Sequence, residues 1–141
     1  MLDCMIVGDS IAVGVATVRT ECVSYSRGGW NTWQWNRDYL KTVSKESTNT
    51  LIISLGSNDH SGVKTESELR KMRHSVTAQR VFWILPYGNL KASNVDIQSI
   101  RDIIQKIASE HGDTLIPITD ISADKIHPTG KGYKELAGKT K

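Results

Sequence analysis

Apolar and polar positions along this chain follow two alternating patterns. Short apolar runs, typical of buried strands, occur at residues 2–7, 21–26, 50–55, 80–85 and 114–118. Between and after them, apolar residues recur every three or four positions, as on one face of a helix, at residues 11–18, 33–43, 65–76, 97–111 and 129–136. Strand and helix thus alternate five times. This predicts an α/β fold, with a five-stranded parallel sheet covered by helices on both faces.

Several polar residues and both cysteines have a predicted place in these segments. Asn31 can cap the second helix, and Thr65 and Glu68 have the spacing of a capping box at the start of the third. Cys4 and Cys22 each lie in an apolar run and lack metal-ligand spacing. We therefore expect both cysteines to be small buried thiols.

Three of the four tryptophans lie close together, at Trp30, Trp33 and Trp35. Trp33 is spaced to share one helix face with Leu40 and Val43, so it is expected to pack in the core. We expect the Trp35 ring to be exposed. Trp30 follows two glycines and is expected to line a pocket, where an indole face could stack on an apolar molecule or a sugar ring.

Composition narrows the function classes. The chain has 141 residues, 38% of them hydrophobic and 23% charged, which fits one domain spanning 1–141 with its own core. Its net charge of +3 is small and scattered, and the basic run 70–73 fits a solvated helix face with Met72 turned inward, so nucleic acid is not an expected partner. There is no membrane-length apolar segment and no signal-peptide pattern. We therefore expect a protein that does not bind membranes and is either cytoplasmic or exported by a route that the sequence does not show.

Candidate chemistry gathers where the predicted strands end. In parallel α/β sheets, ligands bind beyond the carboxyl ends of the strands. Ser10 follows the first strand and opens a helix, where free N–H groups favour a developing negative charge. Gly29 and Asn58 follow the second and third strands and could offer a backbone and an amide N–H. Asp124 and His127 follow the fifth, at a spacing that lets the carboxylate orient the imidazole.

These residues stand in motifs that resemble those of the SGNH hydrolases, also called the GDSL esterase/lipase superfamily. The matching stretches are "GDSI" at 8–11, the glycine of "RGGWNT", "GSND" at 56–59 and "DKIHPTGKGY" at 124–133. They span nearly the whole chain in the family's order and spacing. The resemblance implies a flavodoxin-like three-layer α/β/α sandwich.

The resemblance also implies a role for each motif residue. Ser10 would be the nucleophile, His127 its base and Asp124 the partner of His127. The Ser10 backbone N–H, Gly29 and Asn58 would form the oxyanion hole, with Gly28 an alternative to Gly29 as donor. The implied reaction is ester hydrolysis through an acyl-enzyme, with no metal and no cofactor.

The weaker candidates for substrate binding lie near these motifs. They are Asp9, Trp30, His60, Tyr87 and Asn89. Because little of the chain is left for a lid or a long-acyl pocket, we expect short acyl groups, above all O-acetyl on a carbohydrate of a cell wall or surface polysaccharide. Such a role would suit a phage- or bacterium-encoded enzyme whose partner is the ester substrate; the sequence does not indicate an oligomeric state.

Three alternatives stay open at this point. The first is a hydrolase of small esters, lysophospholipids or thioesters. The second is a glycan-binding module that has kept the fold. The third is a receiver-like domain in which Asp9 and Asp59 bind Mg²⁺, although the acidic pair expected after the first strand is missing.

Overall fold

The computed structural model describes residues 1–88 and 94–141, and its strands and helices alternate as predicted. The strands are β1 (Leu2–Gly8), β2 (Val23–Ser26), β3 (Ser47–Ser54), β4 (Thr77–Ile84) and β5 (Thr114–Ile116). The helices are α1 (Ser10–Val18), α2 (Thr32–Val43), α3 (Thr65–Ser75), α4 (Ile97–His111) and α5 (Gly130–Lys139). None of these helices has both the length and the apolar character needed to cross a membrane.

The strands form one sheet in the order β2-β1-β3-β4-β5, and every neighbouring pair is parallel. The predicted α/β fold is therefore confirmed. After β2 the chain crosses to the other side of β1, so the direction of winding reverses between β1 and β3. Sheets of this order bind ligands at that reversal, beyond the strand ends. Ser10 and Asn58 follow the two strands that border it.

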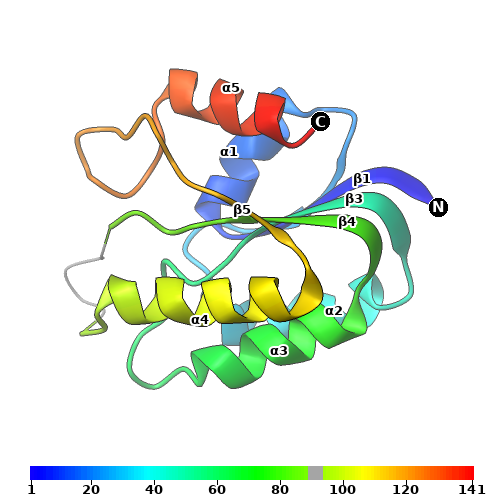
Figure 1. Cartoon of the computed structure of the whole chain (residues 1–141), viewed down its shortest axis with the longest axis horizontal. Coiled ribbons are helices and arrows are strands. Elements are labelled where there is room, and N and C mark those ends of the chain that lie inside the picture. The colour runs from blue at the N-terminus through cyan, green and yellow to red at the C-terminus, as the bar shows by residue number, and fades with distance from the viewer. Residues whose placement is uncertain (89–93) are drawn as a thin grey trace.

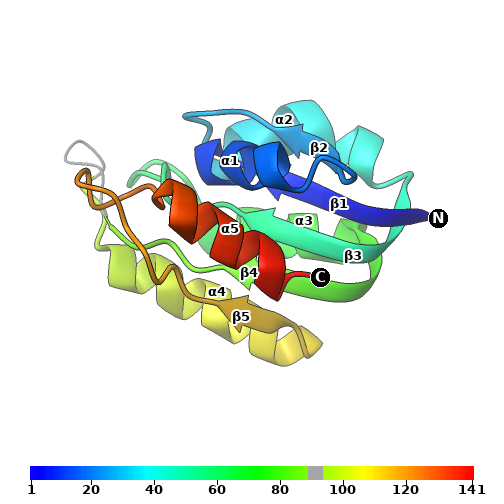
Figure 2. The same ribbon diagram turned by 90° about the horizontal axis from the view of Figure 1, so that it is seen from above.

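Helices cover both faces of the sheet, as Figures 1 and 2 show: α1 and α5 lie on one face, and α2, α3 and α4 on the other. Each layer has its own apolar core, because successive side chains of a strand point to opposite faces. In β1, Cys4 and Ile6 belong to the core under α1 and α5, while Met5 and Val7 belong to the other. A continuous apolar run such as β1 is the pattern expected of a strand buried on both faces.

The end of β1 lies unusually close to β3. Gly8 has φ +143°, and a Cβ placed there would stand 1.8 Å from the Ser54 carbonyl oxygen. Only glycine fits this approach. The same carbonyl accepts a hydrogen bond from the Asp9 backbone N–H at 2.9 Å. The residue before Ser10 is thereby fixed directly to the neighbouring strand.

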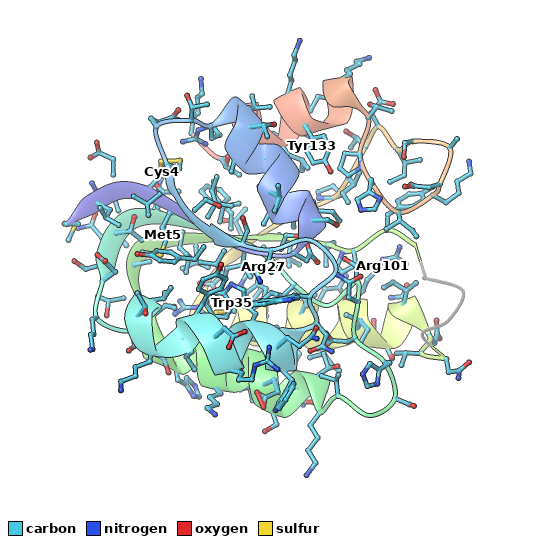
Figure 3. The ribbon with its side chains drawn as sticks, turned by 180° about the vertical axis from the view of Figure 1, so that it is seen from behind. Cys4, Met5, Arg27, Trp35, Arg101 and Tyr133 are labelled. Atoms are coloured by element: carbon cyan, nitrogen blue, oxygen red, sulfur yellow. A yellow bond between two sulfur atoms is a disulfide. The ribbon has the colours of Figure 1, made fainter. Side chains whose placement is uncertain are left out.

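The expectation of two buried free thiols is wrong, because Cys4 and Cys22 form a disulfide. Met5 pairs with Val23 in the parallel ladder of β1 and β2, so the residues just before them stand side by side, with Cα atoms 4.8 Å apart. Figure 3 shows the sulfur atoms at the Cys4 label, at the end of the sheet where β1 begins. Strand register created this pairing, and spacing along the sequence could not show it.

The predicted places of two tryptophans in α2 are also wrong, and they are exchanged. Trp35 has no exposed surface, whereas 49% of Trp33 is exposed. The two rings lie on opposite flanks of the buried helix face, so periodicity alone places them about equally well. Trp35 is drawn inward because its indole N–H donates to the Tyr25 carbonyl at 2.8 Å and its ring packs against Tyr39.

The two predicted helix caps had different outcomes. Asn31 caps α2 in a full capping box with Gln34. The capping box predicted for α3 is wrong: Lys64 stands at the N-cap position without a side-chain hydrogen bond. The Thr65 hydroxyl donates to Asp59 instead, at 2.8 Å. A hydroxyl that could have capped its own helix thus ties that helix to the loop before it.

Candidate active site

Ser10 is the first residue of α1, directly after a one-residue connection from β1. Asp9 caps the helix, and its carboxylate accepts the Ile11 N–H at 3.1 Å. The Ser10 hydroxyl therefore stands at the positive end of a helix and at the carboxyl edge of the sheet. Both features favour a nucleophile whose attack creates negative charge beside it.

His127 and Asp124 complete a chain of hydrogen bonds that begins at Ser10. The Ser10 Oγ lies 2.8 Å from the His127 Nε2, and the His127 Nδ1 lies 2.7 Å from an Asp124 carboxylate oxygen. A carboxylate only accepts, so Nδ1 carries the ring proton and Nε2 offers its lone pair to the serine hydroxyl. This is the tautomer in which His127 can take a proton from Ser10.

The loop between β5 and α5 holds this pair in place although it is not buried. Ile121 and Pro128 form an antiparallel bridge across the loop, and the Ser122 N–H donates to the His127 carbonyl at 2.9 Å. Lys125 lies at the turn with φ +61°. The loop thus turns back on itself between Asp124 and His127, which brings the carboxylate to the ring.

The Asp124 carboxylate is the most heavily hydrogen-bonded group of the loop. The His127 ring, the backbone N–H groups of His127 and Ile126, and the Ser122 hydroxyl all donate to it. These donors, the His127 ring first, hold the pKa of the Asp124 carboxyl well below its usual value. Asp124 is therefore charged at any pH at which the imidazole can act as a base.

Asn58 and the Gly28–Gly29 turn supply the candidate oxyanion donors. Asn58 donates one amide N–H to the Trp30 carbonyl at 3.0 Å, which fixes the amide and leaves its second N–H to a ligand. A Cβ on Gly28 would stand 3.7 Å from the Ser10 Cβ, so this glycine borders the nucleophile. Gly29 follows it in the left-handed region at φ +79°. The assignment of the backbone donor to Gly29 stays a prediction.

The buried position of Asp9 contradicts its predicted contact with substrate. Asp9 has no exposed surface, and the hydroxyls of Ser54 and Ser57 donate to its two carboxylate oxygens, both at 3.0 Å. Burial raises the pKa of this carboxyl from 3.8 to about 6, against the lowering effect of these hydrogen bonds. Asp9 supports the turn that carries Ser10 and does not face a ligand.

Asp59 is a second buried carboxylate, and sequence analysis did not give it this structural role. The Thr32 N–H and hydroxyl and the Thr65 hydroxyl donate to it, at 2.8 to 3.0 Å. Burial raises the pKa of this carboxyl too. Asp59 therefore joins the first residues of α2 and α3 and fixes the loop that carries Asn58. Its position after Asn58 in "GSND" was the available signal.

These contacts do not fit the receiver-like alternative. The carboxylates of Asp9 and Asp59 are each enclosed by hydroxyl and N–H donors from different elements. Among the residues that the structure describes, the only group with metal-ligand geometry is Cys4, Glu21 and Cys22, in which both thiols are oxidised to the disulfide. The two aspartates are structural supports and not a paired cation site.

The weaker candidates lie in three different settings. The Trp30 ring is half-buried: its centroid lies 5.5 Å from that of Tyr39 and 4.8 Å from the Arg27 guanidinium. Trp30 thus contributes to packing through its ring, and its backbone carbonyl accepts the hydrogen bond from Asn58. Tyr87 is exposed, and its carbonyl accepts a hydrogen bond from Arg101. His60 is exposed and lines a groove next to the site. Asn89 lies outside the described residues.

Known structures share this fold from end to end, although no protein-family model and no curated protein matches the sequence. A G-D-S-L family lipolytic protein from Veillonella parvula is similar at a TM-score of 0.69 and 15% identity, with 99% of this chain and 96% of that one covered. An acetylxylan esterase from Geobacillus stearothermophilus is similar at a TM-score of 0.64 and 14% identity, with 96% of this chain and 90% of that one covered. The catalytic domain of the Streptococcus pneumoniae peptidoglycan O-acetyltransferase A is similar at a TM-score of 0.70 and 16% identity, with 96% of this chain and 88% of that one covered. The fold expected from the SGNH resemblance is therefore confirmed.

Proposed function

We propose that this chain is a serine esterase that removes short acyl groups, most of all O-acetyl groups from a carbohydrate. The observation that carries the proposal is the continuous hydrogen-bond chain from Ser10 through His127 to Asp124. The groups stand at the reversal point of the sheet, on elements that the rest of the fold holds in place. A nucleophile, a base and an orienting carboxylate in this relation are the parts that acyl transfer needs.

The reaction follows from these positions. The Ser10 oxygen attacks the ester carbonyl carbon while the His127 Nε2 takes the hydroxyl proton. Asn58, the Ser10 N–H and the Gly29 N–H stabilise the negative charge on the carbonyl oxygen. His127 then gives its proton to the leaving alcohol as the carbon–oxygen bond breaks. A water molecule, deprotonated by His127, then attacks the acyl-serine. His127 returns this proton to the Ser10 oxygen as the acyl carbon–oxygen bond breaks, which releases the carboxylic acid.

The choice of an acetylated carbohydrate rests on two observations. Two of the connections that border Ser10 are short: Asp9 alone before α1, and residues 27–31 before α2. Such connections provide little apolar wall for a long acyl chain. Two proteins of similar fold are named for acetylxylan and for peptidoglycan O-acetyl groups. Hydrolysis of small esters, lysophospholipids or thioesters is the alternative activity, and glycan binding without catalysis is the alternative function.

The Cys4–Cys22 disulfide bears on where the enzyme would act. Disulfides persist in oxidising compartments and are rare in the cytosol. We therefore propose an oxidising compartment rather than the cytoplasmic one of the two locations expected from the sequence. Cell-wall and surface polysaccharides are accessible to an enzyme outside the cytosol, which agrees with the proposed substrate class.

The test is hydrolysis of p-nitrophenyl acetate, butyrate and octanoate by the wild type and by Ser10→Ala and His127→Ala. We expect kcat/KM to fall with acyl length, and both variants to lose at least about 10³-fold in kcat. A best substrate with an acyl chain longer than about eight carbons would contradict the short-acyl proposal. Activity that persists in Ser10→Ala, or no activity on these esters or on acetylated sugars, would favour glycan binding without catalysis.

A further inference from the structure

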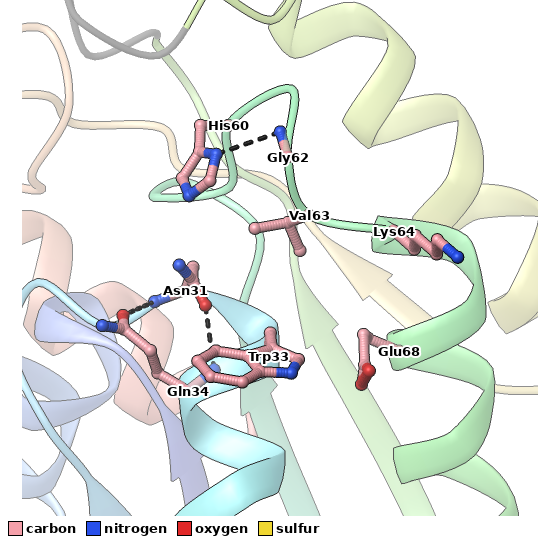
Figure 4. Close-up of a pocket in the computed structure, with 8 residues that line it drawn as sticks. All are labelled: Asn31, Trp33, Gln34, His60, Gly62, Val63, Lys64 and Glu68. Carbon is pink, nitrogen blue, oxygen red and sulfur yellow. Dashed lines mark hydrogen bonds between the residues drawn. The ribbon is translucent and has the colours of Figure 1, made fainter.

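A groove lies between the start of α2 and the loop from β3 to α3, the segments that directly follow the proposed oxyanion donors in the chain. Its volume is about 530 Å³, which is in the range of small-ligand sites. Figure 4 shows the Trp33 ring, the His60 ring and Val63 around one hollow, with Asn31 and Gln34 on the α2 side. Ser10, His127 and Asp124 do not line it. The groove is therefore separate from the proposed reacting groups.

Trp33 gives this groove an exposed aromatic surface on a rigid element. The side chain belongs to the first turn of α2, which Asn31 and Asp59 both anchor. The Arg37 guanidinium lies 5.1 Å from the Trp33 ring centroid and fixes the ring from within the helix. Because 49% of the Trp33 side chain remains exposed, its ring contributes less to the stability of the fold than a buried indole would. It is available to stack on an apolar face of a ligand.

The polar groups of the groove are already oriented by the fold. The Gly62 N–H donates to the His60 Nδ1 at 3.0 Å, so the ring proton lies on Nε2, where it can donate to a ligand. The Asn31 and Gln34 side chains accept each other's backbone N–H groups at 2.9 Å through their oxygens. This pairing uses both amide oxygens and leaves the NH₂ group of Asn31, which Figure 4 shows on the side facing His60, as a donor to a ligand. An aromatic face bordered by fixed N–H donors suits a sugar ring and its hydroxyls.

Two residues that line the groove closely follow the proposed oxyanion donors along the chain. Asn31 stands two residues after Gly29, and His60 two residues after Asn58. Two residues span at most about 7.2 Å, so the backbone of each lining residue lies within that distance of the backbone of a proposed donor. A glycan whose acetyl carbonyl lies against Ser10 can therefore place the next unit of its chain in the groove.

We propose that this groove binds a sugar unit adjacent to the acetylated one, with the Trp33 ring as its stacking surface and His60 and Asn31 as hydrogen-bond donors. The proposal rests on the proposed esterase function and extends it from a single acetyl group to an oligosaccharide. The groove makes the enzyme selective for acetyl groups carried on a glycan chain over those on small esters.

The test compares Trp33→Ala and Trp33→Phe with the wild type on p-nitrophenyl acetate, on acetylated xylotetraose and on O-acetylated peptidoglycan fragments. Trp33→Ala should raise KM about tenfold on the oligosaccharide that the wild type hydrolyses, with kcat nearly unchanged, because the ring binds substrate and transition state alike. Trp33→Phe should keep most of the binding. Val18→Ala, which removes an exposed apolar side chain at the far end of α1, is the matched control and should change nothing.

A binding measurement separates this proposal from the esterase function. Unacetylated xylotetraose and chitotetraose are titrated into the wild type while the indole N–H signals are followed by NMR. We expect the Trp33 signal to shift with one of them, and Trp33→Ala to lose binding. An unchanged KM in Trp33→Ala together with no shift from either sugar overturns the proposal. Binding at Trp33 in a protein without esterase activity would support the groove and overturn the hydrolase function instead.

Discussion

Asp9 and Asp124 both stand within three residues of a proposed reacting group, yet the burial of their carboxyl groups and the direction of their pKa shifts are opposite. The strand-end half, formed by Asp9, Ser10, Asn58 and Asp59, has buried carboxylates, and burial raises the pKa of Asp9 to about 6. The loop half, formed by Asp124 and His127, is partly open to solvent, and hydrogen bonds lower the pKa of Asp124. The local environment therefore suits the Asp9 carboxyl to a structural role and the Asp124 carboxylate to the proposed catalytic one.

The division has a physical reason. A carboxylate that must stay charged to orient an imidazole needs several donors and contact with water, and Asp124 has both. A carboxylate that joins a strand to a helix turn needs donors fixed on separate elements, which burial supplies at the cost of a less favourable charged form. In the proposed mechanism, the strand-end half holds the nucleophile in place and the loop half carries out the proton transfer.

The sharpest way to break this comparison is to neutralise the exposed carboxylate. Asp124→Asn should lower kcat about 10³- to 10⁴-fold, because the amide no longer holds the proton on Nδ1 and His127 loses its lone pair toward Ser10. The measurement is kcat on p-nitrophenyl acetate. Asp120→Asn, on the same loop but bonded through its backbone carbonyl, is the control and should stay near wild type. A loss of less than tenfold in Asp124→Asn would show that the carboxylate is not needed.

Asn58 tests whether the strand-end half also takes part in the chemistry. Asn58→Ala should lower kcat about 10²- to 10³-fold with little change in KM, because the amide donates only to charge that develops in the transition state. Asn58→Asp keeps the shape but removes the donor, and it should be at least as impaired. Steady-state kinetics on the same ester measure both. If Asn58→Asp retained wild-type kcat, the oxyanion role would be excluded.

Removing the disulfide, which lies at the opposite end of β1 from Ser10, tests whether that end contributes to the stability of the fold without affecting the site. Cys4 and Cys22 close a loop with a sequence separation of 18. The double variant Cys4→Ala/Cys22→Ala should lose about 3 kcal/mol in the free energy of unfolding while the folded protein keeps its kcat. Urea unfolding with and without dithiothreitol measures this. Reductant should destabilise the wild type and leave the double variant unchanged; equal responses would contradict the disulfide.

The smallest expected effect concerns the buried carboxylate. Because the pKa of Asp9 is raised from 3.8 to about 6 on folding, the charged form costs nothing below about pH 4, and the cost grows until about pH 6. Asp9→Asn does not titrate, so its unfolding free energy relative to wild type should rise by at most about 3 kcal/mol from pH 4 to pH 7. Urea unfolding at several pH values measures the difference. A difference that is independent of pH would show that Asp9 is not buried as a titrating group.

Most of the fold was accessible from the sequence because local pattern and global structure agree in it. The apolar runs of β1 and β3 are continuous because both faces of these strands are covered, and α4 is recognised by four isoleucines that share one face. The motif residues were also accessible, since each stands at a strand end. What periodicity could not assign was any side chain whose position depends on a neighbour from another part of the chain.

Trp33 and Trp35 show this limit most clearly. Both fit the edge of the α2 apolar face, and the Tyr25 carbonyl decides which one is buried. Likewise, Thr65 has a capping hydroxyl, but the nearby Asp59 takes it. In each case contacts with residues outside the helix outweigh a local preference worth about 1 kcal/mol.

The sequence by itself determined the order of strands and helices and the residue types at each strand end, because these depend on periodicity and on local backbone chemistry. Only the tertiary structure decided that Cys4 meets Cys22, that Asp9 is a buried support and that Trp33 borders a groove. These outcomes depend on strand register and on which groups lose contact with water when the layers pack. Burial and register are properties of the assembled sheet, and no short stretch of the chain carries them.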